Sequence, residues 1–197
     1  MRILFPAVAA SLAIASPAFA QSDPKAPVEA LSDGLIAIMK GGGKLGQSGR
    51  ASQIAGIIDR SFDLPLMARL AVGGAWAEAA PADRAALVAA FRRLTINEYA
   101  HNFDSWGGET FRIDPNVDAR GGDRLVKTML VVPRDAPVAI AYRLRENAGQ
   151  WRIIDVYYKN SISQLTTRRS DFEGIVRTGG VRALVTHVNA LADKAAR

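Results

Sequence analysis

Apolar residues recur every three or four positions along the first half of the chain, the spacing of a helix with one buried face. Val28, Leu31, Leu35 and Ile38 show this spacing, and Gly41 ends the helix they predict. After a glycine-rich loop over 41–49 the spacing returns and predicts further helices. One ends near residue 62, one begins near 65 and ends at 73, and the longest runs from 81 to 103.

The period changes from helical to alternating after Gly108. Val138, Ile140, Tyr142 and Leu144 alternate with small or charged residues, which predicts a strand with one buried face. The predicted strands cover 110–114, 124–132, 138–145 and 151–158, and two helices follow at about 163–177 and 181–195. This order indicates an α+β fold, with helices packed on a curved antiparallel sheet of about four strands that encloses an apolar pocket.

The first twenty residues have the features of an export signal. Arg2 precedes an apolar run over 3–14, which is shorter than the roughly 20 residues that a membrane-spanning helix needs. Ala18-Phe19-Ala20 is a typical signal-peptidase site. We therefore expect a signal peptide at 1–20 and one mature domain over 21–197 in the periplasm. Since the chain has no cysteine, packing rather than disulfides must stabilise this domain.

The chain is basic, with a formal net charge of +6 and a pI of about 10. Nucleic acid is one partner of basic proteins. We expect no nucleic-acid partner here, because export separates the two and the arginines are scattered. The charge suits transient contact with anionic membranes or an acidic partner, or simply aids solubility.

The glycine-rich loop contains a pattern associated with nucleotide cofactors. Residues 41–46 fit G-x-G-x-x-G, which binds a dinucleotide when it lies between a strand and a helix. A predicted helix precedes the pattern here, so we expect no cofactor. His101 and His187 lie on separate predicted helices, and without cysteine we expect no metal site.

Two carboxylates are candidate general bases. Asp155 lies among apolar residues of the last predicted strand, and Asp104 follows the longest predicted helix. Since buried carboxylates are normally paired, the favoured interpretation of Asp155 is a structural ion pair with Arg143 or Arg168. For Asp104 the favoured interpretation is hydrogen bonding at the helix end. Arg168 suits a phosphate head group equally well, or a solvated helix face.

Four segments, in order, resemble the MlaC / toluene-tolerance family of periplasmic lipid carriers. They are Ser-Phe-Asp-Leu-Pro-Leu-Met-Ala-Arg-Leu at 61–70, the helix over 81–94, Trp-Arg-Ile-Ile-Asp-Val at 151–156, and the stretch 161–172. Together they cover about 62–191. The stretches 99–105 and 162–169 are most similar to the HpnM group, which is associated with hopanoid biosynthesis.

The resemblance implies a pocket that carries a phospholipid or hopanoid-type lipid between membranes, without catalysis. It also implies docking to a membrane transport complex of ABC or related type. Within such a pocket we expect Arg168 near the head group and these residues against the lipid: Phe91, Leu94, Phe103, Val126, Leu130, Val138, Ile140, Tyr142, Leu144 and Ile153. The alternatives are a small exported enzyme with Asp155 or Asp104 as base, and an interaction module whose own side chains fill the pocket.

Overall fold

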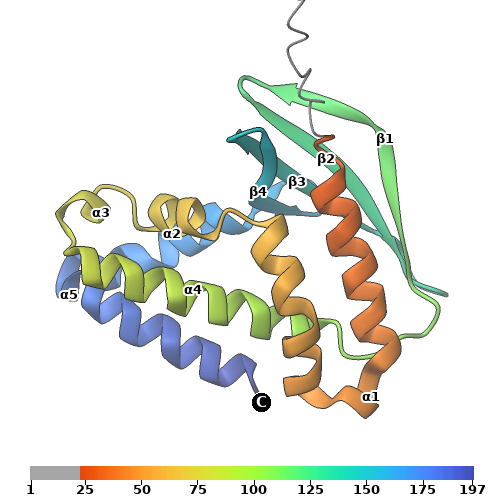
Figure 1. Ribbon diagram of the computed structural model, residues 1–197, viewed down its shortest axis with the longest axis horizontal. Coiled ribbons are helices and arrows are strands. Elements are labelled where there is room, and N and C mark those ends of the chain that lie inside the picture. Colours follow the sequence, from red (N-terminus) through yellow and green to blue (C-terminus); the bar gives the residue numbers. More distant parts are fainter. Residues whose placement is uncertain (1–22) are drawn as a thin grey trace, which may run out of the picture.

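A layer of helices and a curved sheet make up the computed structural model, which describes residues 23–197 (Figure 1). The predicted signal peptide lies outside the described residues. The helices are α1 (Ala26–Ser61), α2 (Leu64–Val72), α3 (Ala75–Glu78), α4 (Pro81–Asn102) and α5 (Gln164–Ala195). The strands are β1 (Thr110–Arg120), β2 (Asp123–Val131), β3 (Val138–Asn147), β4 (Gln150–Tyr158) and β5 (Ile162–Ser163). None of the described helices is both long and apolar enough to cross a membrane.

The predicted glycine loop is a bend inside α1. Gly42 (φ 43°) and Gly46 (φ 61°) have backbone angles that only glycine adopts easily, and helical residues surround them. The two arms of α1 therefore run antiparallel, one beside the other (Figure 1). α1 reaches 36 residues only because two helical arms are joined across this bend, and α5 is likewise interrupted at Gly180, so α4 with 22 residues is the longest unbroken helix, as predicted.

Arg50, just after this bend, is buried at 7% exposure. Its guanidinium donates to the carbonyls of Ala100 (2.8 Å) and Gly42 (3.1 Å) and to the side chain of Gln47 (3.1 Å). The Gln47 amide donates in turn to the carbonyl of Ala195 (2.8 Å). Carbonyls at the C-terminal ends of helices carry partial negative charge, so they stabilise this buried cation. These contacts join the bend of α1 to the ends of α4 and α5.

The sheet is antiparallel in the order β1-β2-β3-β4-β5. The predicted α+β class is confirmed, although the two-residue β5 was not predicted. β1 was predicted to end at Asp114, but it continues through Pro115 to Arg120 with a register irregularity between Ile113 and Val117. An edge strand tolerates proline because one of its sides makes no ladder hydrogen bonds.

A bulge interrupts the pairing of β4 with β3. Arg143 pairs with Asp155, but the next residue, Leu144, pairs with Ile153. The extra residue reverses the alternation of side chains along β4. Ile153 therefore shares the inner face of the sheet with Val156, whereas Asp155 turns to the outer face beside Arg143.

α4 and α5 pack along each other beneath the sheet (Figure 1). α5 is interrupted at Gly180, where φ is 66° and the backbone is not helical, so the predicted break between the two final helical segments lies there. The core between the layers includes Leu35, Ile58, Leu87 and Val188, each at 1% exposure or less. This packing fixes α4 in front of the inner face of the sheet.

Candidate functional site

A cavity of about 530 Å³ lies between the inner face of the sheet and α4. This volume falls in the range of roughly 300–1,000 Å³ that small-molecule pockets occupy. The cavity is open to solvent, since its wall includes the exposed residues Tyr158 (43%), Asn102 and Gln164. Most of the remaining wall is aliphatic or aromatic.

One face of α4 supplies the helical wall. Phe91, Thr95, Glu98, Tyr99 and Asn102 line the cavity and follow the helical repeat. The Thr95 hydroxyl is already satisfied, since it donates to the Phe91 carbonyl at 2.9 Å. The Tyr99 ring stacks on Phe103 with centroids 5.9 Å apart. This face is therefore aromatic with a few polar groups.

The sheet supplies the opposite wall through residues that face each other across strands. Val138, Ile140 and Tyr142 alternate along β3 and line the cavity, as the sequence predicted. Ile140 pairs with Tyr158 and Tyr142 pairs with Val156 on β4. Because directly paired residues share a face, the pairing explains why both β4 residues also line the cavity.

Seven of the eleven residues predicted for the lipid site line this cavity: Phe91, Phe103, Leu130, Val138, Ile140, Tyr142 and Arg168. The other four, Leu94, Val126, Leu144 and Ile153, lie in the hydrophobic core at 0–1% exposure and do not line it. The Asp63 amide donates to the Ile153 carbonyl at 2.9 Å, so the helices close directly on the sheet at that end. Contact of any of these residues with lipid stays a prediction.

The structure adds residues that the sequence analysis missed: Phe62, Met67, Thr95, Glu98, Tyr99, Asn102, Val156, Tyr158 and Gln164. The α4 residues follow Phe91 at helical spacing, which could have revealed them. They were overlooked because most of them are polar. Val156 and Tyr158 were missed because the bulge in β4 reversed the expected alternation.

Charged and phenolic groups gather on one part of the wall. Arg168 forms an ion pair with Glu98, and its guanidinium lies 5.7 Å from the centre of the Phe91 ring. Burial raises the pKa of Tyr142. Burial also raises the pKa of Tyr99, as do Tyr142 and Glu98, while Arg168 lowers it. Both phenols are therefore protonated at neutral pH.

The two candidate bases lie outside the cavity. Asp155, at 4% exposure, accepts hydrogen bonds from the Ser163 hydroxyl (2.6 Å) and from the Val156 and Leu165 amides (2.8 and 3.0 Å). These hydrogen bonds connect β4 to β5 and the start of α5, and the predicted arginine partners are wrong. Arg143 pairs with Asp123 instead, and Arg168 with Glu98.

Asp104 is exposed and accepts a hydrogen bond from the Ser105 hydroxyl at 3.0 Å. Among residues 23–197 no group of His, Cys, Asp and Glu side chains is arranged to hold a metal ion. The cavity itself therefore brings together largely hydrocarbon walls, three phenols and one ion pair, which suits binding better than acid–base chemistry.

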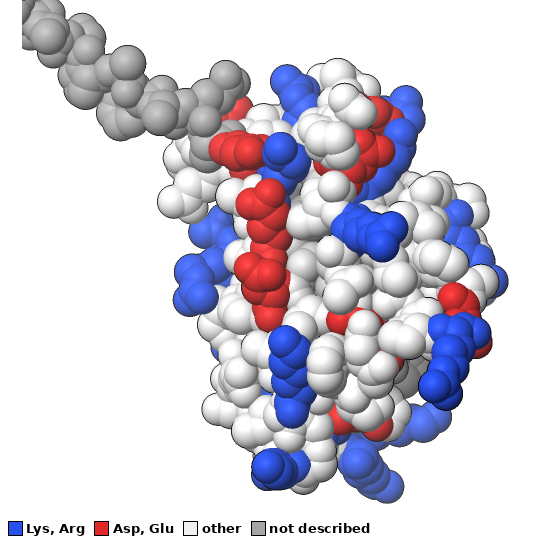
Figure 2. All heavy atoms as spheres, turned by 90° about the vertical axis from the view of Figure 1, so that its right-hand side faces the viewer, with Lys and Arg blue, Asp and Glu red and all other residues white. Residues whose placement is uncertain are grey.

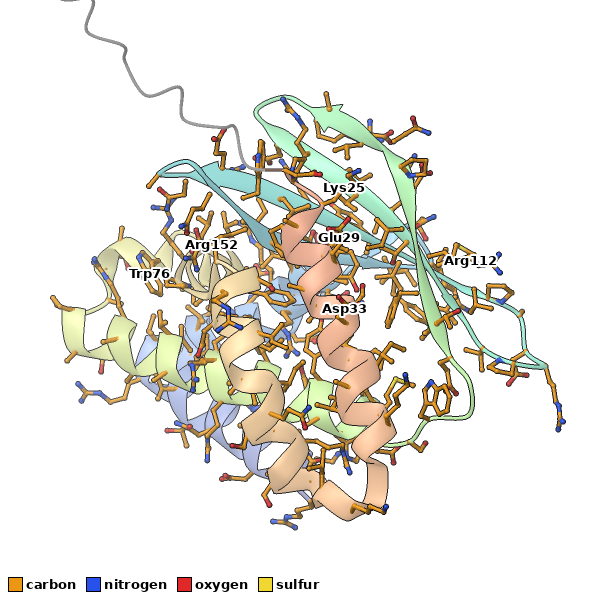
Figure 3. The ribbon with its side chains drawn as sticks, turned by 45° about the vertical axis from the view of Figure 1, so that its right-hand side comes forward. Lys25, Glu29, Asp33, Trp76, Arg112 and Arg152 are labelled. Carbon is orange, nitrogen blue, oxygen red and sulfur yellow. The ribbon has the colours of Figure 1, made fainter. Side chains whose placement is uncertain are left out.

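Charges of both signs are interspersed on the face shown in Figure 2, where acidic side chains form a column. In Figure 3 the exposed Glu29 and Asp33 lie on the first arm of α1, whereas Arg112 projects from β1 away from the helices. This face lacks the continuous basic strip that a nucleic acid would need.

The MlaC protein family matches residues 29–190, which is most of the chain. The chain belongs to the MlaC family. Its fold is similar to that of a phospholipid-binding protein from Ralstonia solanacearum, solved in complex with a phospholipid. The TM-score is 0.74 at 23% identity, over 89% of this chain and 100% of that one. The family resemblance inferred from the sequence is confirmed, and the HpnM branch stays a prediction.

Proposed function

We propose that this MlaC-family protein is a periplasmic carrier that holds a phospholipid in the cavity between α4 and the sheet. The cavity of about 530 Å³ with its largely apolar wall carries the proposal. The phospholipid bound to the Ralstonia solanacearum protein of the same fold supports this choice of cargo. A hopanoid-type lipid, suggested by the HpnM resemblance, is the second candidate.

Hydrocarbon burial supplies the affinity. Each buried methylene contributes about 0.8 kcal/mol, so roughly ten of them contribute about 8 kcal/mol before the costs of ordering. Few directed contacts are needed for such binding. Arg168, on the cavity wall with its side chain 24% exposed, is the expected neighbour of the head group.

The other parts of the proposal rest on the family. MlaC-type carriers work in the periplasm with a membrane transport complex, and the export signal predicted at 1–20 agrees with that location. We infer that this protein shuttles its lipid between membranes by docking transiently to a complex of ABC or related type.

Two alternatives are less well supported. An enzyme with Asp155 or Asp104 as base would need that carboxylate in the cavity, and both lie outside it. An interaction module filled by its own side chains would lack an open cavity of this size. The carrier function therefore agrees best with an open cavity that contains neither carboxylate.

The test is mass spectrometry of organic extracts of the purified protein, with Asp155→Asn as the variant that separates carrier from enzyme. Wild type should release stoichiometric phospholipid, and Asp155→Asn should release the same lipid at a similar yield. The extracted head group and chains decide between phospholipid and hopanoid cargo. A folded wild type that neither carries nor binds lipid would overturn the carrier proposal.

A further inference from the structure

Two tyrosine hydroxyls inside the cavity lack a hydrogen-bond partner. Tyr142 on β3 lines the cavity at 1% exposure, and Tyr99 lines it from α4. Within residues 23–197 neither phenol oxygen is hydrogen-bonded to protein. Neither hydroxyl is among the fully buried side-chain atoms of the described residues that lack a partner, so both keep some surface in the cavity. Tyrosine hydroxyls in such places usually find a hydrogen-bond partner. The two donors are therefore available to an acceptor that enters the cavity.

These tyrosines share the cavity wall with the ion pair, since Tyr99, Tyr142, Glu98 and Arg168 all line the same cavity. Arg168 and Glu98 already satisfy each other. The phenols, held protonated by burial, remain available to donate.

The polar groups differ in how far they are buried. The side chains of Arg168 and Glu98 are 24% and 35% exposed, Tyr99 is partly buried, and Tyr142 is almost completely buried. Apolar side chains such as Ile140 and Phe91 form most of the rest of the wall. A glycerophospholipid combines the matching groups, since its ester carbonyls lie between a charged head group and hydrocarbon chains.

We propose that Tyr99 and Tyr142 donate hydrogen bonds to the ester carbonyls of a glycerophospholipid, and so select ester lipids over hydrocarbon lipids of similar size. This inference rests on the proposed carrier function. A pentacyclic hydrocarbon offers no acceptor, so its entry would remove water from both donors and leave them unpaired. The apolar wall accepts any hydrocarbon, and the phenols supply the discrimination.

The experiment compares lipids that differ only in the linkage. Delipidated protein is titrated with phosphatidylglycerol carrying two ester-linked hexadecanoyl chains, and with the analogue carrying two ether-linked hexadecyl chains. The pentacyclic hydrocarbon diploptene is the third probe, and displacement of a fluorescent fatty acid measures affinity. The variants are Tyr99→Phe, Tyr142→Phe and their double variant. Tyr157→Phe is the matched control, because Tyr157 lies on the outer face beside Arg143.

Wild type should bind the ester lipid about three- to tenfold more tightly than the ether lipid, the range that one net hydrogen bond supplies. The double variant should bring this ratio close to one by weakening the ester lipid, and Tyr157→Phe should retain it. Equal binding of both linkages by wild type overturns the inference and leaves the carrier function standing. Tighter binding of diploptene than of the ester lipid also overturns it. Binding of none of the three overturns the carrier function, and the inference with it.

Discussion

Ile140→Glu places a carboxyl group in the wall of the cavity. Ile140 is 9% exposed and lies between Thr128 and Tyr158 on the inner face of the sheet. In the lipid-free protein, water reaching the cavity solvates the new group. When a lipid enters, that water leaves, and Arg168 cannot compensate because it is already paired with Glu98.

The loss of affinity follows from this desolvation. Leaving a buried polar group without a partner costs about 1–3 kcal/mol in proteins, which corresponds to roughly 5- to 150-fold weaker binding. Lipid also raises the pKa of the introduced carboxyl above its usual value of about 4.3. The bound state therefore prefers the protonated form, so the affinity of the variant should rise as the pH falls through that raised pKa.

Displacement of a fluorescent fatty acid by phosphatidylglycerol measures this affinity between pH 5 and 8. Ala139→Glu is the matched control, because it adds the same group to the outer face one residue earlier and should bind like wild type. Circular dichroism and urea denaturation establish that each variant is folded. A folded Ile140→Glu protein with wild-type affinity at pH 7 would refute the assignment of this cavity as the lipid site.

Two further predictions concern stability. Arg50→Met should lower the free energy of unfolding by about 3–5 kcal/mol, because it leaves the Gly42 and Ala100 carbonyls unpaired. Urea denaturation measures this free energy of unfolding. The control Arg60→Met removes an exposed arginine and should change the free energy of unfolding by no more than about 0.5 kcal/mol. Equal effects of the two substitutions would contradict the role of Arg50. Hydrogen bonds from Arg145 and Arg143 hold the pKa of Asp123 below its usual value. The ionised carboxylate therefore contributes to the stability of the folded state above about pH 3.9, and this contribution is lost as the pH falls through the lower folded-state pKa. Asp123→Asn should therefore destabilise the protein at pH 7 and progressively less below pH 4, and a difference independent of pH would contradict this.

The sheet wall of the cavity was predictable where a strand is regular. Val138, Ile140 and Tyr142 follow a period of two that depends on local backbone geometry alone. The same reasoning failed on β4, because the bulge at Ile154 depends on pairing with β3 and on the hydrogen bonds that the next residue, Asp155, accepts from Ser163 and the start of α5. No glycine marks this bulge in the sequence. Regular alternation would put Asp155 on the same face as Ile153, whereas the bulge puts it on the opposite face beside Arg143.

The helical wall was only half predictable for a different reason. A core is found by looking for apolar residues at helical spacing, and this criterion selected Phe91 and Leu94. A cavity that opens to solvent also retains polar side chains, so Glu98 and Asn102 lie on the same wall as Phe91. Leu94 is apolar and packs in the hydrophobic core instead of lining the cavity. The pattern of apolar and polar residues thus predicts which positions are buried. It does not predict whether a side chain lies in the packed core or on the wall of an open cavity.

Two inner-face residues on one strand make it possible to test binding and selectivity separately. Ile140 contributes hydrocarbon surface, so a charge there should weaken every lipid alike, whatever its linkage. Tyr142, two residues further along, contributes a hydroxyl, so its removal should weaken ester lipids and leave ether lipids unchanged. The free energy of burying chains is large and nearly independent of lipid identity, whereas a hydrogen bond is small and specific. A carrier that must accept one lipid among many hydrocarbons needs both terms, and variants at Ile140 and Tyr142 change them one at a time.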